Sequence, residues 1–269
     1  MKQTEYFIIS VIAIALGAIV CWLQFVNCCI AQTGSELDLK RSAGARKTVV
    51  VNGVEFAFRW VPAGSFVMGS PLTEPGRFDD ETPHKATLTK GFWIMETETT
   101  QKQWSAVMGD NPSRFKDESK PVECVSWSDC QEFCKKCSQS GLKLQLPTEC
   151  QWEYACRAGS AGAYPGELEK TTWYADNCGG KTQPVGSKEP NAWGLYDMTG
   201  NVWEWCADWY GAYENKDVTD STGPQTGSFR LFRGGGWHES ANYCRCATRG
   251  YSDPDYQDGN FGFRCIISE

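Results

Sequence analysis

Histidine is nearly absent from this sequence, and its scarcity limits the metal centres that the chain can build. Only His84 and His238 occur among 269 residues. A zinc ribbon needs two Cys-x-x-Cys pairs, whereas only Cys134 and Cys137 have that spacing. A facial iron site would need both histidines and a carboxylate that no pattern singles out. Zinc and iron are therefore weak interpretations.

Basic residues are too few to give the chain a positive surface. It carries 26 Lys and Arg against 33 Asp and Glu, a formal net charge of -7. Because phosphate binding needs a basic face, we expect no nucleic-acid partner. The sequence also lacks a glycine-rich phosphate loop, a nucleophile elbow, a His-Glu-x-x-His helix and an internal repeat. These absences argue against several common enzyme classes.

Cysteine, in contrast, is abundant, with 14 residues. A cytosolic chain rarely carries so many cysteines without a metal, so disulfides in an oxidising compartment are the better interpretation. Hydrophobic residues make up 41% of the chain and charged residues 22%, which is enough apolar material for a sizeable core. The composition therefore predicts a folded, exported protein.

The N-terminus supports export. Lys2 is the only basic residue before an apolar run from Phe7 to Val26. Signal peptidase could cut after Cys29-Ile30-Ala31, Cys28 could be lipidated, or the run could remain as an anchor. We therefore expect a periplasmic, secreted or membrane-anchored protein at the cell surface, and the last two outcomes would attach it to a membrane.

The chain divides into three predicted segments. Residues 1–31 form the signal peptide, lipoprotein or anchor segment, and the polar residues 32–47 form a linker. The single folded domain spans residues 48–269. It starts with a predicted hairpin, Val49 to Phe56, whose turn is Asn52-Gly53.

Three helices are predicted from capping residues and apolar periodicity. The first is capped by Thr99 or Thr100, the second by Ser128, and the third by Thr148, which forms a capping box with Gln151. Beyond the third helix the chain reads as loops and short strands. This order predicts an α+β fold with little regular secondary structure.

Several short segments, in a fixed order between residues 60 and 265, resemble the formylglycine-generating (sulfatase-modifying factor) family. They are Phe66–Ser70, Pro83-His84, Pro121–Trp127, Leu146–Glu149, Trp152–Ala155, Asn191–Met198, Gly200–Trp205, Arg233–Trp237 and Gly262–Arg264. The resemblance implies that family's variant of the C-type lectin fold. The family includes copper oxidases that make formylglycine in sulfatases, iron-dependent sulfoxide synthases, and ligand-binding domains such as the variable proteins of diversity-generating retroelements. Fold alone therefore does not decide function.

The resemblance also shows what this chain lacks as an oxidase. The oxidases bind copper(I) through two thiols that follow a Gly-Gly-Ser motif, and that serine lines the active site. Here the motif is Gly234-Gly235-Gly236, and only Cys244 lies between it and Cys246. Copper is therefore not expected and no catalytic residue is assigned. The alternative remains a sulfatase-modifying oxidase or another metal-dependent oxidoreductase of the family.

A structural calcium ion is what the resemblance implies in place of copper. Asp197, Glu204 and the carbonyl groups of Gly200 and Val202 match the family's calcium loop, and hard oxygen ligands suit calcium. The alternative is that both carboxylates only cap local backbone groups. The family's other calcium loop is shortened here, between Asp176 and Gly186, and is not expected to bind.

Two disulfides are implied by correspondence with the family. Cys134 is expected to pair with Cys265, and Cys156 with Cys246. The remaining cysteines of the folded domain cannot be paired from sequence.

The segment from Trp237 to Asn260 decides between enzyme and binding protein. Tyrosine with small polar residues is the composition of adaptable binding surfaces. The predicted ligand-binding residues are Trp237, His238, Tyr243, Tyr251, Asp255, Tyr256, Asp258 and Asn260. The alternative is an ordinary solvated loop. We expect an extracellular protein or glycan as the partner.

Overall fold

The domain begins with a β-hairpin, and the last strand of the chain joins the same sheet as this hairpin. The computed structural model describes residues 41–268. The predicted leader and most of the linker therefore lie outside the described residues. Strands β1 (Arg46–Val51) and β2 (Val54–Val61) pair antiparallel around Asn52 and Gly53, as predicted. Both turn residues have positive φ, 49° and 79°, which an Asn-Gly turn tolerates.

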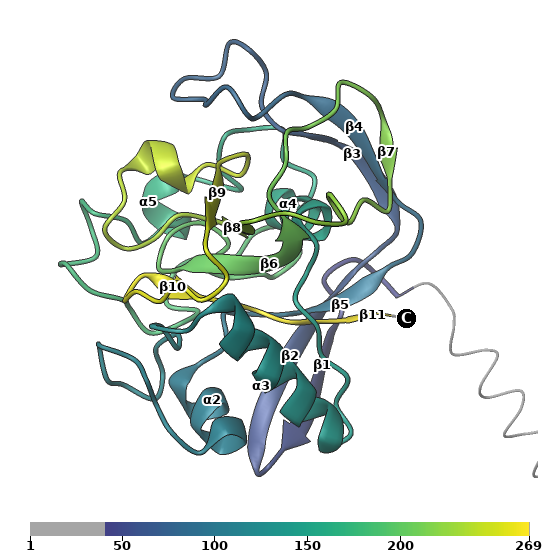
Figure 1. The fold of residues 1–269 in the computed structure, drawn as a ribbon. Coiled ribbons are helices and arrows are strands. Elements are labelled where there is room, and N and C mark those ends of the chain that lie inside the picture. The colour runs from purple at the N-terminus through teal and green to yellow at the C-terminus, as the bar shows by residue number, and fades with distance from the viewer. Residues whose placement is uncertain (1–40, 269) are drawn as a thin grey trace, which may run out of the picture. The chain divides into compact units, whose positions relative to one another are not determined.

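Three sheets carry the strands. The first has the order β1-β2-β5-β11, with β5 at Phe92–Met95 and β11 at Ile266–Ser268. The second has the order β10-β6-β8-β9, built from Phe261–Gly262, Trp203–Trp209, Arg230–Arg233 and Arg249–Ser252. The third has the order β3-β4-β7, built from Gly64–Met68, His84–Leu88 and Val218–Thr219. Figure 1 shows that helices cover only part of these sheets and that long loops connect them.

The three longer helices begin after residues whose side chains accept backbone hydrogen bonds. Helix α2 (Gln101–Met108) is capped by Thr100, and α4 (Glu149–Arg157) by Thr148 with the predicted capping box. The cap predicted for α3 (Trp127–Gln139) was wrong. Ser126, not Ser128, caps it, because Ser126 forms a reciprocal capping box with Asp129. Two shorter helices complete the fold, α5 (Leu168–Thr171) and the 3-10 helix η1 (Ala241–Cys244).

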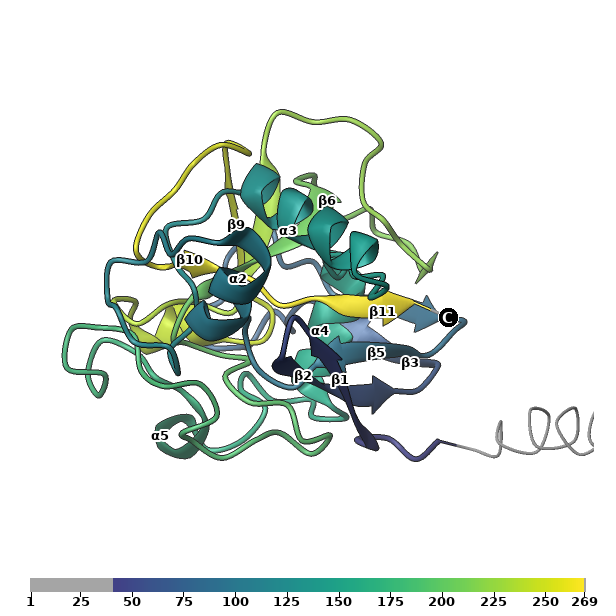
Figure 2. The ribbon, with the colours of Figure 1, turned by 90° about the horizontal axis from the view of Figure 1, so that it is seen from below.

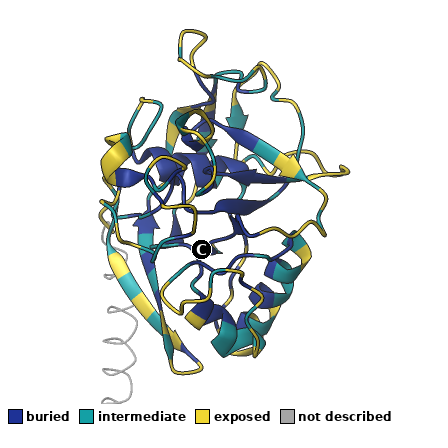
Figure 3. Ribbon diagram, turned by 90° about the vertical axis from the view of Figure 1, so that its left-hand side faces the viewer, coloured by how far each residue is buried: buried dark blue, intermediate teal, exposed yellow. Residues whose placement is uncertain are grey.

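Aromatic side chains join the helices to the first sheet. Helices α2 and α3 lie side by side (Figure 2), and Trp104 stacks on Phe133 at 5.5 Å between ring centroids. Phe56 of β2 lies 6.4 Å from Phe133 between ring centroids, and Phe263, which directly follows β10, meets Phe133 edge to face at 5.2 Å. A second apolar cluster surrounds α4, and Figure 3 shows the buried strands and helices beneath exposed loops. No helix in residues 41–268 is long and apolar enough to cross a membrane.

Candidate functional site

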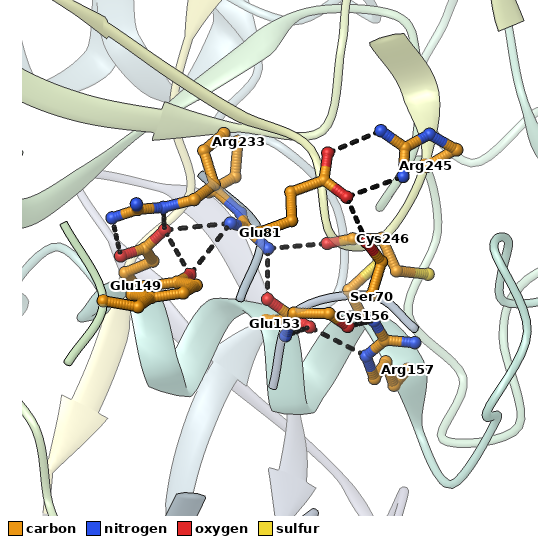
Figure 4. A network of polar contacts seen from close by, with 12 residues as sticks. Ser70, Glu81, Glu149, Glu153, Cys156, Arg157, Arg233, Arg245 and Cys246 are labelled. Carbon is orange, nitrogen blue, oxygen red and sulfur yellow. Dashed lines mark hydrogen bonds and ion pairs between the residues drawn. The ribbon is translucent and has the colours of Figure 1, made fainter. Parts of the chain in front are cut away.

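A buried network of ion pairs fixes the base of the segment from Trp237 to Asn260 (Figure 4). Arg233, at the end of β8, contacts Glu149 at 2.9 Å and Glu153 at 2.5 Å, both on α4. Arg249, at the start of β9, binds the same Glu149 at 2.6 Å. Opposite charges neutralise each other here, so the Arg249 guanidinium and its neighbour hold the pKa of Glu149 below its usual value despite burial.

A second group of ion pairs, made by Arg245, holds the middle of the segment. Arg245 contacts Glu81 at 2.5 Å and Glu74 at 2.8 Å, and these two carboxylates come from the loop between β3 and β4. Ser70 donates its hydroxyl to Glu81 at 2.6 Å. Since Arg245 and Arg249 are both buried, the backbone between them is held by charged groups rather than by surface contacts.

Most of the predicted binding residues point outward from this base. His238, Tyr243, Tyr251, Asp255, Tyr256 and Asp258 are exposed, and Trp237 is partly buried. Asn260 departs from the expected exposure, because only 6% of it is accessible. Its backbone carbonyl accepts the Trp203 amide at 2.8 Å, and its side-chain amide nitrogen lies 3.4 Å from Nε2 of His238.

Each exposed tyrosine is supported from one side by another ring. Tyr251 stacks on Tyr210 with ring centroids 4.0 Å apart. Tyr243 packs against Phe78 at 5.1 Å. Tyr256 meets Phe261 edge to face at 5.4 Å. These contacts limit the rotamers of the three tyrosines while leaving about half of each side chain in solvent.

The exposed residues are spread along the segment rather than gathered at one point. Tyr251 lies on β9 and Asp258 shortly precedes β10, and these strands form opposite edges of the second sheet. In Figure 1 both strands lie on the left side of the view. Asp255 accepts a hydrogen bond from Ser128 at 2.9 Å, so the loop after β9 rests on the start of α3.

The cysteines that the resemblance pairs lie next to each other. The sulfur atoms of Cys134 and Cys265 are 3.6 Å apart, and those of Cys156 and Cys246 are 3.5 Å apart. All four side chains are buried and stand as free thiols in the structure. The pairings therefore remain predictions, with partners already adjacent.

The carboxylate of Glu204 is fully occupied by other groups. Arg264 donates to both of its oxygens at 2.7 Å, and the indole of Trp152 donates at 2.8 Å. This saturation leaves Glu204 poorly suited to hold a cation. Among residues 41–268 no group of three or more His, Cys, Asp and Glu side chains has metal-binding geometry.

Glu98, which the sequence analysis missed, supplies the free oxygens instead. Both of its carboxylate oxygens are buried without a hydrogen-bond donor, as is Oδ1 of Asp197. The other Asp197 oxygen accepts the Gly186 amide at 2.7 Å. Burial, together with the charge of the facing carboxylate, raises the pKa of Glu98 well above its usual value, and burial raises that of Asp197 to about 6. Two such groups side by side fit a cation or a shared proton. No periodic pattern marks Glu98, so only the fold reveals it.

Cys244, the thiol that follows the Gly234–Gly236 motif, lies buried against the turn that this motif forms. Cys244 is fully buried, and a Cβ on Gly235 would come within 2.6 Å of its sulfur. Burial raises the pKa of the Cys244 thiol to about 12. Trp203 is 4% exposed and packs in the core.

Known proteins match most of this domain. A family model described as the sulfatase-modifying factor enzyme 1-like domain matches residues 52–269. Chaperone protein LppX of Paenibacillus barcinonensis is 32% identical over 241 residues, covering 69% of this chain and 83% of that protein. The formylglycine-generating enzyme of Streptomyces coelicolor is 38% identical over 167 residues, covering 54% and 52%. The chain thus spans about half the length of the formylglycine-generating enzymes it matches.

Two solved structures share the fold over nearly their whole length. Treponema denticola variable protein 1 superposes with a TM-score of 0.78 and 31% identity, covering 84% of this chain and 99% of that one. PvdO from Pseudomonas aeruginosa superposes with a TM-score of 0.77 and 27% identity, covering 86% and 100%. The fold class predicted from the sequence is confirmed by these matches.

Proposed function

Because the chain belongs to the formylglycine-generating (sulfatase-modifying factor) family, we propose that it uses the family's fold to bind a ligand outside the cell. The observation that carries this proposal is the set of three exposed tyrosines, Tyr243, Tyr251 and Tyr256, each backed by another ring. Large aromatic side chains held in place contribute contact area at a low cost in ordering. A protein or a glycan is the expected ligand.

The buried ion pairs give this surface its rigid base. Arg245 and Arg249 tie the segment to Glu81 and Glu149, so the exposed side chains can change without disturbing the backbone beneath them. His238, Asp255 and Asp258 add hydrogen-bonding groups at other exposed positions of the segment. The likeness to a Treponema denticola protein named as a variable protein supports a role in which such a surface diversifies, as in retroelement variable proteins.

Export and a structural cation are part of the same proposal. Two pairs of buried thiols already lie 3.5–3.6 Å apart, which suits disulfide formation in an oxidising compartment. Calcium would be held by Asp197 and Glu98, whose free oxygens fit a hard cation, together with the carbonyl groups of Gly200 and Val202.

The test of binding is replacement of Tyr243, Tyr251 and Tyr256 by Ala. We screen the wild-type domain on a printed glycan array and against a display library of extracellular protein domains, and then measure the variant with each hit. Binding should be lost while the melting temperature stays within a few degrees, because each tyrosine is half exposed. The control is Leu72→Ala, an exposed apolar residue on another loop. Unchanged binding by the triple variant would refute the proposal.

An oxidase is the second candidate, and one contact favours it. The Cys178 thiol donates to the Trp237 carbonyl at 2.9 Å, so a second thiol reaches the turn against which Cys244 packs. The two candidates separate in a copper(I)-loading assay with mass spectrometry of a Cys-x-Pro-x-Arg peptide. We expect no formylglycine, and turnover would establish the oxidase.

A further inference from the structure

A polar hollow lies apart from the turn at Trp237, between the start of α4, the end of β6 and the loop 211–224. It encloses about 560 Å³. Its deepest side chains are buried yet carry charge or titratable groups: His84, Glu149, Cys150, Asp208 and Arg249. The loop 211–224 forms its outer wall, and nothing in the proposed ligand-binding role uses this volume.

Asp208 is the group in the hollow that lacks a full set of partners. One carboxylate oxygen accepts the Glu149 amide at 2.8 Å. The other lies against Gly223, where a Cβ would meet it at 3.0 Å, and no donor from the described residues bonds it. Only 4% of Asp208 is accessible, so this oxygen faces the hollow from a nearly buried side chain.

The other charges around the hollow are mostly matched. Glu149 is neutralised by Arg233 and Arg249. Glu214 pairs with Lys216, whereas Asp220 accepts hydrogen bonds from Thr89 and keeps its charge. Asp208 on the floor and Asp217 on the exposed loop are the lining carboxylates that have no ion pair and an oxygen without a donor among residues 41–268. The unmatched charge is therefore negative.

The glycine at position 223 keeps the hollow open beside Asp208. Its φ of 66° lies in the left-handed region, and a side chain there would be strained as well as pressed against the carboxylate. The backbone thus approaches Asp208 closely without covering its second oxygen with a side chain.

We propose that this hollow is a binding site for a basic group, an alkylammonium or guanidinium that contacts Asp208. A cation would give the open oxygen its missing donor and would balance the unmatched charge, whereas an anion would meet two carboxylates. The volume is more than enough for a short chain of a few carbons with a charged group at one or both ends. The proposal is independent of the tyrosine surface, and a free amine should bind without any larger ligand.

The experiment titrates agmatine into the ¹⁵N-labelled domain and follows amide chemical shifts. The amides of Gly223 and Glu149 should move in wild type. Asp208→Asn keeps an oxygen to accept the Glu149 amide but removes the charge, and should weaken binding roughly ten-fold, about 1.4 kcal/mol. The matched control Asp176→Asn changes an exposed aspartate outside the hollow and should leave binding unchanged.

Two further measurements keep the test decisive if Asp208→Asn does not fold. Wild type should bind agmatine more weakly at pH 5.5 than at pH 8, because protonation removes the Asp208 charge. Glu149, Arg249 and Arg230 face this carboxyl group from α4, β9 and β8, and none of them changes charge in that range. His84 on β4 also lines the hollow, so the same comparison is made on His84→Gln, where the pH difference should persist. Equal shifts with neutral butane-1,4-diol, or no shift of the Gly223 amide with agmatine, would overturn the proposal.

Discussion

Glu98, and not the predicted Glu204, is the carboxylate with free oxygens beside Asp197. Two carboxyl groups lie side by side in the interior, and three of their four oxygens lack a donor. A buried charge without a partner costs several kcal/mol, so this pair of carboxyl groups needs either a shared proton or a bound cation. A cation with oxygen ligands satisfies both groups at once.

Removing calcium should therefore lower the melting temperature of the domain, and Glu98 should control the effect. Wild type is expected to lose several degrees on addition of chelator, as measured by calorimetry at pH 7.5. Glu98→Gln should abolish this shift because it removes one negative ligand. Glu204→Gln serves as the control: it should destabilise the fold with and without calcium, since it weakens the bonds to Arg264. If chelator has no effect on wild type, the two carboxyl groups share a proton and the calcium assignment is wrong.

Asp208 should give the stability of the domain a characteristic dependence on pH. Burial raises its pKa to about 7 from an ordinary value of 3.8. Between these values the folded protein keeps a proton that the unfolded chain has lost, so stability falls as the pH rises from about 4 to 7. Urea unfolding should show wild type losing on the order of a few kcal/mol against Asp208→Asn over that range. Parallel curves for the two proteins would contradict the assignment.

At the scale of elements, helix α3 makes two different side-chain contacts at its first turn. Ser126 caps the helix through the Asp129 amide, whereas Ser128 faces outward and binds Asp255 of the proposed binding segment. Two serines only two residues apart therefore have different structural roles. One sets where the helix begins, and the other supports the loop after β9.

These two serines make a matched pair for mutation. Ser126→Ala should cost about 1 kcal/mol of unfolding free energy, because the Asp129 amide loses its acceptor. Ser128→Ala should cost under about 0.5 kcal/mol, as is usual for a surface substitution. Urea denaturation of both variants measures the difference. Equal losses would mean that the capping box does not fix the start of α3.

For the molecule as a whole, the predicted disulfides would join distant parts of the chain. Cys134 and Cys265 are 131 residues apart, and Cys156 and Cys246 are 90 apart. In the chain-entropy model, closing loops of this length contributes roughly 4–5 kcal/mol each. Peptide mapping of exported protein without reductant should find both links, and reduction should lower the melting temperature by many degrees. Cys265 linked to Cys130 or Cys137 would show the first pairing to be wrong.

The sequence predicted the features that depend on local chemistry. The Asn52-Gly53 turn and the Thr148 capping box are short-range signals, and both are confirmed. The cap of α3 was misplaced because Ser126 and Ser128 are both acceptable caps, and only the bond from Asp129 separates them. Glu98 and the hollow at Asp208 escaped prediction because each depends on residues about 100 and 60 positions away, which only the fold brings together.

After Trp237, a continuous buried stretch is flanked by exposed residues, and this arrangement affects which positions can change during evolution. Cys244 to Arg249 are buried without interruption, while Tyr243, Tyr251 and Asp255 to Asp258 are exposed on either side. Mutations at the exposed codons would change the surface without reaching the ion pairs of Arg245 and Arg249. The domain can therefore accept a large number of sequences at these positions with one backbone, which makes the segment a ready framework for a randomised library.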